Sequence, residues 1–383
     1  MIVHSYLNQK LKQQKQKIMN WFNIKNIEEI DTPALLIYKD RAKQNIEKAI
    51  SLVHSIEQLR PHVKTHKLLE ISKMMMEYGI HKFKCATISE AEMLGMAKAK
   101  DVLIAFPILG PKIKRLQALI VKYPETKFSC LIDNIDTTED LSDSFLEDKI
   151  DVYIDLNVGM NRTGISVEDA FDLYKKTSNL SGIHIIGLHA YDGHIHDMDV
   201  NQRKHKADKV FQLIVLVQLE IEKFAEKKLK IVVGGSPTFS LYAFAHEDVE
   251  VSPGTFIFWD AGYKETMPDF DFLWAGIIIT RVISIINKTH LCLDLGHKSI
   301  AAENPLPRIK FLSNDEIIPI GQSEEHLVVQ VENTAKYALG DVWYGVPIHI
   351  CPTVALYNEV KVVEENMATD AWKVIARDKV ITV

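Results

Sequence analysis

Short apolar runs alternate with amphipathic stretches over about residues 58 to 260. The apolar runs have the length of strands, and they predict eight: Gln58–Lys64, His81–Thr87, Asp101–Phe106, Lys127–Asp133, Ile150–Asn157, Ile183–Tyr191, Lys230–Gly234 and Pro253–Trp259. Most stretches between them have helical spacing; in Ser166–Ser178, for example, Ala170, Phe171 and Tyr174 share one face. Strands that alternate with helices predict a parallel sheet.

Further helices are predicted at three places. Ser89–Ala97 begins with Ser89 as a cap and has Glu92 three residues later, the spacing of a capping box. Asn201–Lys228 predicts one long helix with charged residues at both ends. The third helix, Asp40–His54, follows a ninth strand candidate, Ala34–Tyr38.

The number of strands favours one architecture. Eight parallel strands close a β/α barrel. The alternative, a doubly wound open sheet, usually has a glycine-rich phosphate turn after its first strand, and no G-x-G-x-x-G occurs in this chain. The sequence therefore predicts a (β/α)8 TIM-type barrel, with Ala34–Tyr38 outside it.

The pattern changes after about Tyr263. The segments that follow are β-rich, and no clear helix separates them: Ile277–Ile286, His290–Leu295, His326–Val331, Val346–Cys351, Val360–Glu364 and Trp372–Val383. This change predicts a second, mainly antiparallel β domain. We expect the barrel domain at 31–263 and the β domain at 264–383, with part of 1–30.

Composition narrows the class of protein. The 383 residues include 45 Lys and Arg against 51 Asp and Glu, a net charge of −6. Nucleic-acid binding needs a clustered basic excess, so we expect no nucleic-acid partner. No apolar run is long enough for a membrane span, and four dispersed cysteines form no disulfide framework. Met1–Lys17 is interpreted as a frayed helix and not a secretory signal, so cytoplasm is the expected compartment.

Candidate chemistry begins at Arg60–Lys67, where two histidines stand close to Lys64 and Lys67 at the end of the first predicted strand. A lysine there points into the barrel mouth. Partial desolvation and neighbouring cations favour a neutral amine, which can form a Schiff base with a carbonyl compound. The alternative is a solvated basic turn.

Two more strand ends carry polar groups. Asn157–Gly164 holds two glycines and Arg162, which could reach an anion, although the segment could be a plain strand–helix connection. Gly187–His196 holds three histidines, including His194, a density typical of acid–base chemistry or metal binding; structural histidines are the alternative.

The remaining candidates lie in two glycine turns and in the β domain. Gly234–Thr238 and Ser252–Thr255 follow late barrel strands, where phosphate cradles are usual, although each could be an ordinary turn. In Pro347–Thr353, His349 and Cys351 would point to the same face of a strand. Imidazole beside thiolate is half of a zinc-type site; the alternative is a buried cysteine beside a surface histidine.

Together these motifs resemble the D-threonine aldolase/D-serine dehydratase family, which has the alanine racemase fold of fold-type III PLP enzymes. The family's R-P-H-x-K-T-H-K, M-N-R-x-G, A-Y-x-G-H, G-G-[ST]-P-T, P-G-T, S-E-E-H and H-x-C-P-T elements stand at Arg60–Lys67, Met160–Gly164, Ala190–His194, Gly234–Thr238, Pro253–Thr255, Ser323–His326 and His349–Thr353. The resemblance covers roughly residues 30 to 383.

The resemblance implies pyridoxal phosphate (PLP) as a Schiff base on Lys64, with Arg162 near its phenolic oxygen and Tyr191 in the pocket. The phosphate would be held by four turn residues: Gly235, Ser236, Gly254 and Thr255. A divalent metal, zinc or manganese, would bind His349 and Cys351. The resemblance also implies a homodimer and places Ala34–Tyr38 with the β domain. Where alanine racemases have an arginine facing the pyridine nitrogen, this chain has Ser252.

The implied activity is that of a D-threonine aldolase, a carbon–carbon lyase acting on small D-β-hydroxy amino acids, with His194 as the base. The alternatives are β-elimination, as in a D-serine dehydratase, and a PLP-binding protein without catalytic activity. A racemase is disfavoured because the second domain lacks an obvious catalytic tyrosine.

Overall fold

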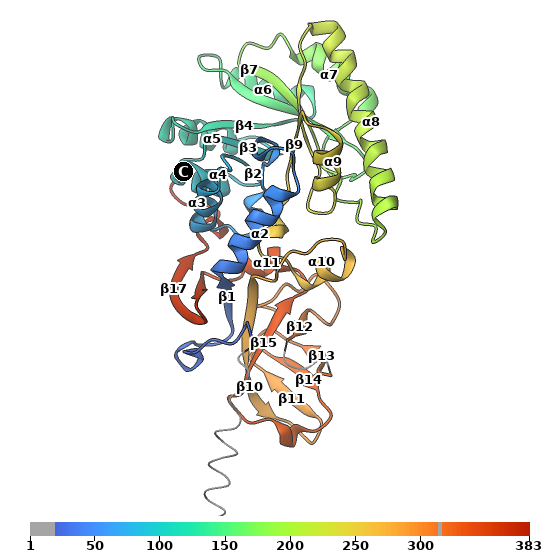
Figure 1. Cartoon of the computed structure of the whole chain (residues 1–383). Helices are drawn as coiled ribbons and strands as arrows, with labels where there is room; N and C mark the ends of the chain where they lie inside the picture. Colours follow the sequence, from blue (N-terminus) through green and yellow to red (C-terminus); the bar gives the residue numbers. More distant parts are fainter. Residues whose placement is uncertain (1–19, 313–315) are drawn as a thin grey trace, which may run out of the picture.

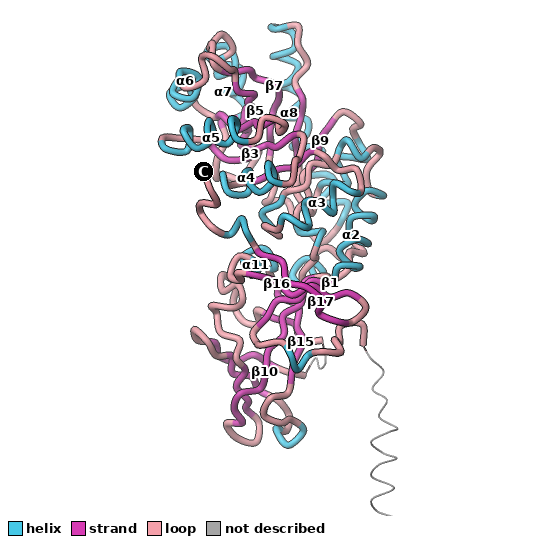
Figure 2. Tube along the Cα trace, turned by 90° about the vertical axis from the view of Figure 1, so that its left-hand side faces the viewer, coloured by secondary structure: helices cyan, strands magenta, loops and turns pink. Residues whose placement is uncertain are grey.

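The computed structural model describes residues 20–312 and 316–383, and the helix expected within Met1–Lys17 lies outside them. A helix-rich part and a strand-rich part are stacked end to end (Figures 1 and 2). The first holds a parallel sheet and the second an antiparallel-rich sheet. The expected fold class, an α/β part with a parallel sheet and a second, mainly antiparallel β part, is thus confirmed.

The parallel sheet has seven strands along its path, in the order β2 (Lys82–Cys85), β3 (Asp101–Pro107), β4 (Lys127–Ile132), β5 (Ile150–Asn157), β7 (Ile183–Ala190), β8 (Lys230–Val233) and β9 (Val249–Val251). A two-residue strand, β6 (Ile165–Ser166), pairs with the end of β5. Six of the predicted barrel strands therefore form close to their expected positions, because each has the length of a strand and buried apolar residues along it.

The first predicted strand, Gln58–Lys64, forms only isolated bridges. Leu59 pairs with Val251 of β9, and His62 pairs with Lys84 of β2. Short 3₁₀ turns flank this segment: η2 (Ile56–Gln58) and η3 (Val63–Thr65). Because one segment pairs with both edges of the sheet, it joins β9 to β2 and completes the ring of strands.

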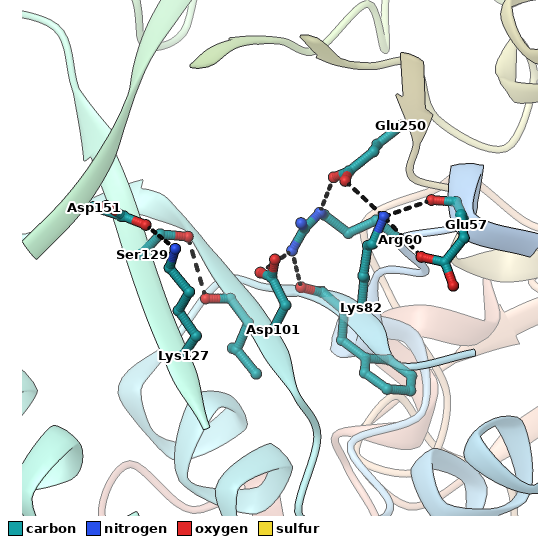
Figure 3. Close-up of polar contacts among 10 residues, drawn as sticks. Glu57, Arg60, Lys82, Asp101, Lys127, Ser129, Asp151 and Glu250 are labelled. Carbon is teal, nitrogen blue, oxygen red and sulfur yellow. Dashed lines mark hydrogen bonds and ion pairs between the residues drawn. The ribbon is translucent and has the colours of Figure 1, made fainter. Parts of the chain in front are cut away.

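Buried charge holds this joining segment in place (Figure 3). The Arg60 side chain is fully buried; its Nε lies 2.6 Å from Glu250 Oε2 and its Nη1 lies 2.7 Å from Asp101 Oδ1. Glu250 also accepts from Lys82 Nζ at 3.1 Å. Burial disfavours a charged Arg60, but the two carboxylates outweigh it and raise the pKa of Arg60. The ion pairs therefore tie the segment to β9 and β3.

The last predicted barrel strand, Pro253–Trp259, is wrong. The strand is β9, four residues earlier, and the predicted segment contains a buried 3₁₀ turn, η4 (Thr255–Ile257). Phe256, Phe258 and Trp259 are apolar because the core encloses this turn. Glu250, which faces Arg60, interrupts the apolar pattern of β9 and hides it from sequence analysis.

The helices of the part that holds the parallel sheet are α2 (Lys39–Ser51), α3 (Leu69–Glu77), α4 (Ile88–Met96), α5 (Pro111–Lys122), α6 (Ile135–Asp143), α7 (Val167–Thr177), α8 (Val200–Ala225) and α9 (Phe239–Ala245). A further helix, α10 (Ala261–Thr266), lies at the junction with the second part (Figure 1). Ser166 caps α7. The predicted capping box of α4 is wrong: Thr87 is the cap, and Glu92 accepts instead from the backbone amides of Thr382 and Val383.

The second sheet has nine strands: β1 (Ala34–Tyr38), β10 (Gly276–Ile285), β11 (His290–Leu293), β12 (Ile309–Phe311), β13 (Ile318–Gln322), β14 (Leu327–Gln330), β15 (Val342–Pro347), β16 (Glu359–Glu364) and β17 (Met367–Lys373). β1 lies between β10 and β16 and makes the one parallel pair recorded in this sheet. Ala34–Tyr38 therefore belongs with the β sheet, as the resemblance implies.

Two predicted strands of this sheet need correction. Val346–Cys351 is wrong, because β15 ends at Pro347 and a short helix, α11 (Ile350–Val354), follows. Trp372–Val383 is strand only to Lys373; a 3₁₀ turn, η6 (Ile375–Arg377), follows it. The chain end then contacts α4 and α5, where Arg115 Nε donates to the Val383 carbonyl at 3.0 Å.

Candidate active site

Lys64 is the last residue of the joining segment; it lies in η3 and is half-buried. The ring of Tyr191, at the end of β7, stands beside it: Lys64 Nζ is 5.4 Å from the ring centroid. The guanidinium carbon of Arg162 is 5.2 Å from the same centroid. The structure thus gathers Lys64, Arg162 and Tyr191, which come from three separate motifs, around one aromatic ring.

The two glycine turns meet through Ser236. Its Oγ accepts from the backbone amides of Gly254 and Thr255, both at 3.1 Å. A Cβ on Gly235 would lie 3.0 Å from Tyr191 Cε2, and one on Gly254 would lie 3.0 Å from the His62 carbonyl oxygen. Glycine at both positions therefore keeps a cradle open beside Tyr191 and the lysine turn, as an anionic cofactor group requires.

Ser252 stands just before the second glycine turn. Its Oγ is buried and has no hydrogen-bond partner among the described residues. A buried hydroxyl without a partner costs free energy unless a bound group supplies one. Together with the glycine cradle, this orphaned hydroxyl means that the residues present fit a polar cofactor such as PLP.

His349 and Cys351 are adjacent, but not on a strand as predicted. His349 precedes α11 and Cys351 lies within it, and their side chains hydrogen-bond to each other. His349 Nδ1 lies 2.6 Å from Glu303 Oε1. Cys351 Sγ lies 3.2 Å from Thr65 Oγ1 and 3.5 Å from Thr255 Oγ1. The β domain thus carries this pair to the lysine turn of the same chain, and α11 lies at the junction of the two parts (Figures 1 and 2).

The pair is electrostatically coupled. Burial works against charge on His349, but its bond to Cys351, the thiolate charge and Glu303 outweigh burial and raise the pKa of His349 to about 9. Burial likewise works against a thiolate, but His349 outweighs it and lowers the pKa of Cys351. The buried carboxylate of Asp260 also favours charge on His349. Sequence analysis missed both Glu303 and Asp260 because they lie far from the H-x-C motif in the chain.

The side chains around His349 and Cys351 limit the kind of metal site that this region can form. Within residues 20–312 and 316–383, no group of three or more His, Cys, Asp or Glu side chains is arranged to enclose a metal ion. The His349 and Cys351 side chains offer two borderline-soft donors, and Glu303 fixes the imidazole as an outer carboxylate does. These residues fit a metal held by two protein ligands, with further positions left for substrate or water.

His194, the predicted base, lies at the surface of the site. It is exposed, and a Cβ on Gly159 would lie 2.7 Å from its Nε2. His194 therefore packs over the loop that carries Arg162, at the same end of the barrel as Tyr191. Its role as a base stays a prediction.

Sequence analysis missed a buried lysine beneath these groups. This residue is Lys84, on β2. Its Nζ lies 3.3 Å from His189 Nε2, and His189 Nδ1 lies 2.7 Å from Asp155 Oδ1. A signal was available: Lys82 and Lys84 alternate with Phe83 and Cys85, so the lysines share one face of the strand.

Comparison with known families identifies this arrangement. The family model described as "Alanine racemase, N-terminal domain" matches residues 37–261, more than half of the chain. A second one, described as "Putative serine dehydratase domain", matches residues 275–363. The chain belongs to the D-threonine aldolase and D-serine dehydratase family. Members of this family are PLP-dependent enzymes of the alanine racemase fold.

Its relatives within the family differ in activity. The chain is 27% identical over 360 residues to a D-threonine aldolase of Arthrobacter sp, covering 91% of this chain and 93% of the relative. It is 22% identical over 402 residues to a D-serine dehydratase of Dictyostelium discoideum, covering 92% and 98%. The crystal structure of D-threonine aldolase from Filomicrobium marinum matches with a TM-score of 0.84 and 25% identity, over 92% of this chain and 96% of that one.

Of the helices in the described ranges, none combines the length and the apolar character that a membrane span requires.

Proposed function

We propose that this protein is a PLP- and metal-dependent D-threonine aldolase, which cleaves D-β-hydroxy amino acids such as D-threonine to glycine and an aldehyde. In this proposal the barrel, residues 31–263, holds the cofactor and the β domain, residues 264–383, holds the metal. The supporting observation is the contact between Thr65 and Cys351, 3.2 Å apart, which joins the lysine turn to the H-x-C pair. The 27% identity to the Arthrobacter aldolase also supports it.

The proposed cofactor residues would each do one task. Lys64 would hold PLP through its amine, and the phosphate would lie in the cradle formed by Gly235, Ser236, Gly254 and Thr255. Arg162 would pair with the phenolic oxygen, and the ring of Tyr191 would pack on the pocket. When bound, PLP supplies an electron sink for the charge that develops at the substrate's Cα.

The proton transfers would fall to the protein. His194 Nε2 would take the proton of the substrate's β-hydroxyl, and Lys64 Nζ would return a proton to Cα. His349 and Cys351 would hold a zinc or manganese ion, which supplies Lewis acidity at that hydroxyl.

A second candidate is β-elimination as in a D-serine dehydratase. It is favoured by the match of residues 275–363 to the dehydratase domain and by the thiol donor Cys351, which suits zinc. In that reaction Lys64 would remove the α-proton and the hydroxyl would leave. A PLP-binding protein without turnover is a weaker candidate, because such a role does not require the β domain and its His349–Cys351 pair.

One assay separates these functions. The protein with PLP is given D-threonine, L-threonine or D-serine, with and without added zinc or manganese. Glycine plus acetaldehyde from D-threonine alone supports the aldolase. Pyruvate or 2-oxobutyrate plus ammonia supports the dehydratase, and no product with any metal contradicts both. Lys64→Ala is the matched control, and it should give no product.

We also propose a homodimer, on the resemblance to alanine racemase-like enzymes. Light scattering coupled to size-exclusion chromatography tests it: a mass of twice 43.6 kDa supports the dimer, and 43.6 kDa contradicts it.

A further inference from the structure

A chain of hydrogen bonds crosses the interior of the barrel beneath the proposed site. It starts at Lys84 on β2, passes through His189 on β7 and reaches Asp155 on β5, over the 3.3 Å and 2.7 Å contacts described above. Thr163 Oγ1 then donates to Asp155 Oδ2 at 3.0 Å. Because a lysine ammonium only donates, His189 accepts at Nε2 and donates through Nδ1 to the carboxylate. Each contact in the chain thus pairs a donor with an acceptor.

The chain ends next to the residues proposed to bind PLP. Lys84 Nζ lies 5.6 Å from the centroid of the Tyr191 ring, which is also the neighbour of Lys64. Thr163, at the other end, follows Arg162 in the sequence. A cavity of about 20 Å³, enough for a single water, is lined by Asp155, Arg162, Thr163, His189 and Tyr191 among others. His189 and Asp155 of the chain therefore share this space with Arg162 and Tyr191 of the proposed site.

Lys84 is an unusual lysine because only 2% of it is exposed. The charged groups that act on it most are Lys64 and Arg60, which disfavour its charge, and Asp155 and Asp192, which favour it; His62 and His189 are also close. Burial and the charge of Lys64 outweigh the two carboxylates and lower the pKa of Lys84 to about 7. Burial also lowers the pKa of both histidines, so they are neutral at pH 7. Lys84 is therefore the member of this group whose charge changes near neutral pH.

We propose that Lys84 is a further residue of the cofactor site, a buried cation braced by His189 and Asp155 that takes up a proton when the anionic cofactor binds. The inference rests on the proposed PLP site at Lys64. PLP brings a phosphate with a charge between −1.5 and −2 at pH 7, roughly that of a phosphorylated side chain. A nearby anion favours the charged form of an amine. The proton passes from solvent to Lys84 Nζ, and the proton transfer itself makes or breaks no other bond.

Linkage gives the sign of the effect. If binding raises the pKa of Lys84, the complex holds more protons than the apoprotein at pH values between the two pKa values. The affinity for PLP then falls as pH rises above 7. Each unit by which binding raises the pKa of Lys84 weakens PLP binding by about tenfold between low and high pH.

Calorimetry with PLP tests this proposal. The apoprotein is titrated with PLP from pH 6.5 to 9 in pairs of buffers that differ in ionisation enthalpy, which counts the protons taken up. Wild type and Lys84→Met are compared. The phosphate of PLP and its bond to Lys64 contribute equally to the proton uptake of the two proteins, so the difference in uptake belongs to Lys84. We expect Lys84→Met to lose about half a proton of uptake near pH 7.5 and to bind PLP about tenfold more weakly at pH 6.5, the effects of a one-unit rise in the pKa of Lys84.

Lys82→Met is the matched control, because Lys82 lies two residues earlier on β2 but bonds to Glu57 and Glu250 at the opposite end of the barrel interior. It should leave proton uptake unchanged. If Lys84→Met does not fold, Asp155→Asn replaces it: Asp155 favours charge on Lys84, so its loss should move the uptake to lower pH.

The outcomes separate this inference from the proposed function. Suppose that borohydride-treated wild type carries pyridoxyl on Lys64, but Lys84→Met, or Asp155→Asn in its place, keeps wild-type proton uptake. The role of Lys84 is then overturned and the cofactor site stands. If wild type carries no pyridoxyl on Lys64, the cofactor site is overturned, and the role of Lys84 with it.

Discussion

Thr65 Oγ1 lies 3.2 Å from Cys351 Sγ, so the residue after Lys64 touches the thiol of the H-x-C pair. The two residues are 286 positions apart in the chain, and one belongs to the barrel and the other to α11 of the β part. A substrate held at Lys64 would therefore lie next to a metal held by His349 and Cys351. This arrangement is the physical basis of the proposed aldolase.

The first prediction concerns the metal. Cys351→Ala removes the thiolate, one of the two protein donors, so we expect bound zinc or manganese to drop and turnover of D-threonine to fall by about 10- to 100-fold or more. Metal content by mass spectrometry and turnover after EDTA treatment measure this. Cys292→Ala, a buried cysteine on β11 with only a backbone contact, is the control. Full activity of EDTA-stripped protein would contradict the proposed role of the metal.

The second prediction concerns the loop under His194. Gly159 has φ = 120°, and a Cβ there would lie 2.7 Å from His194 Nε2. Gly159→Ala should displace the imidazole and lower kcat by about tenfold, a loss within the usual contribution of one general base, while PLP binding persists. Gly321→Ala, where no heavy atom lies within 4 Å of the added Cβ, should change nothing. Wild-type kcat in Gly159→Ala would argue against His194 as the base.

The third prediction concerns barrel stability. Glu250→Gln leaves the fully buried Arg60 with a neutral acceptor in place of a carboxylate. We expect the free energy of unfolding to drop by about 2 kcal/mol, because Arg60 keeps Asp101 but loses one of the two carboxylates that compensate its buried charge. Urea unfolding measures it. Glu325→Gln breaks an exposed pair with Lys298 and should cost less than about 1 kcal/mol; equal losses in the two variants would refute this reading.

The fourth prediction concerns pH. Burial lowers the pKa of His66 to about 3, whereas the value in the unfolded chain is about 6.5. Between these values the unfolded state binds more protons, so stability is complete above pH 6.5 and falls as pH drops. The loss from this group is about 1.4 kcal/mol per pH unit below 6.5.

Urea unfolding from pH 8 to 5 checks this slope. In the wild type, the Leu68 amide donates to His66 Nδ1 at 3.0 Å. His66→Asn keeps a side-chain acceptor for this amide but removes the titrating group. The variant should therefore lose stability more slowly on acidification. An unchanged slope would show that His66 does not carry the effect.

The sequence predicts most barrel strands because their outward faces are apolar and buried against helices. It misplaces the strand around Glu250 because the barrel interior is polar, and an inward carboxylate interrupts the apolar run. Lys84 and Asp155 face the same interior, and the sequence analysis did not single them out. A polar residue at alternate positions of an otherwise apolar barrel strand is the signal that would have found them.

Long-range contacts lie beyond what the sequence shows. His349 and Cys351 were expected side by side on a strand, and they do lie together, but through the start of α11. The bond from His349 to Glu303 and the contact from Cys351 to Thr65 depend on how the two parts of the chain meet. Nothing in the local pattern of either segment encodes that meeting.

The most direct test is chemical trapping of the cofactor on Lys64. The protein is incubated with PLP, reduced with borohydride, digested and weighed by mass spectrometry, with Lys64→Ala treated in parallel. We predict a pyridoxyl group on the peptide that contains Lys64 and none on that peptide in the variant. Wild-type protein with no adduct at Lys64, or with its adduct on another lysine, would contradict the account.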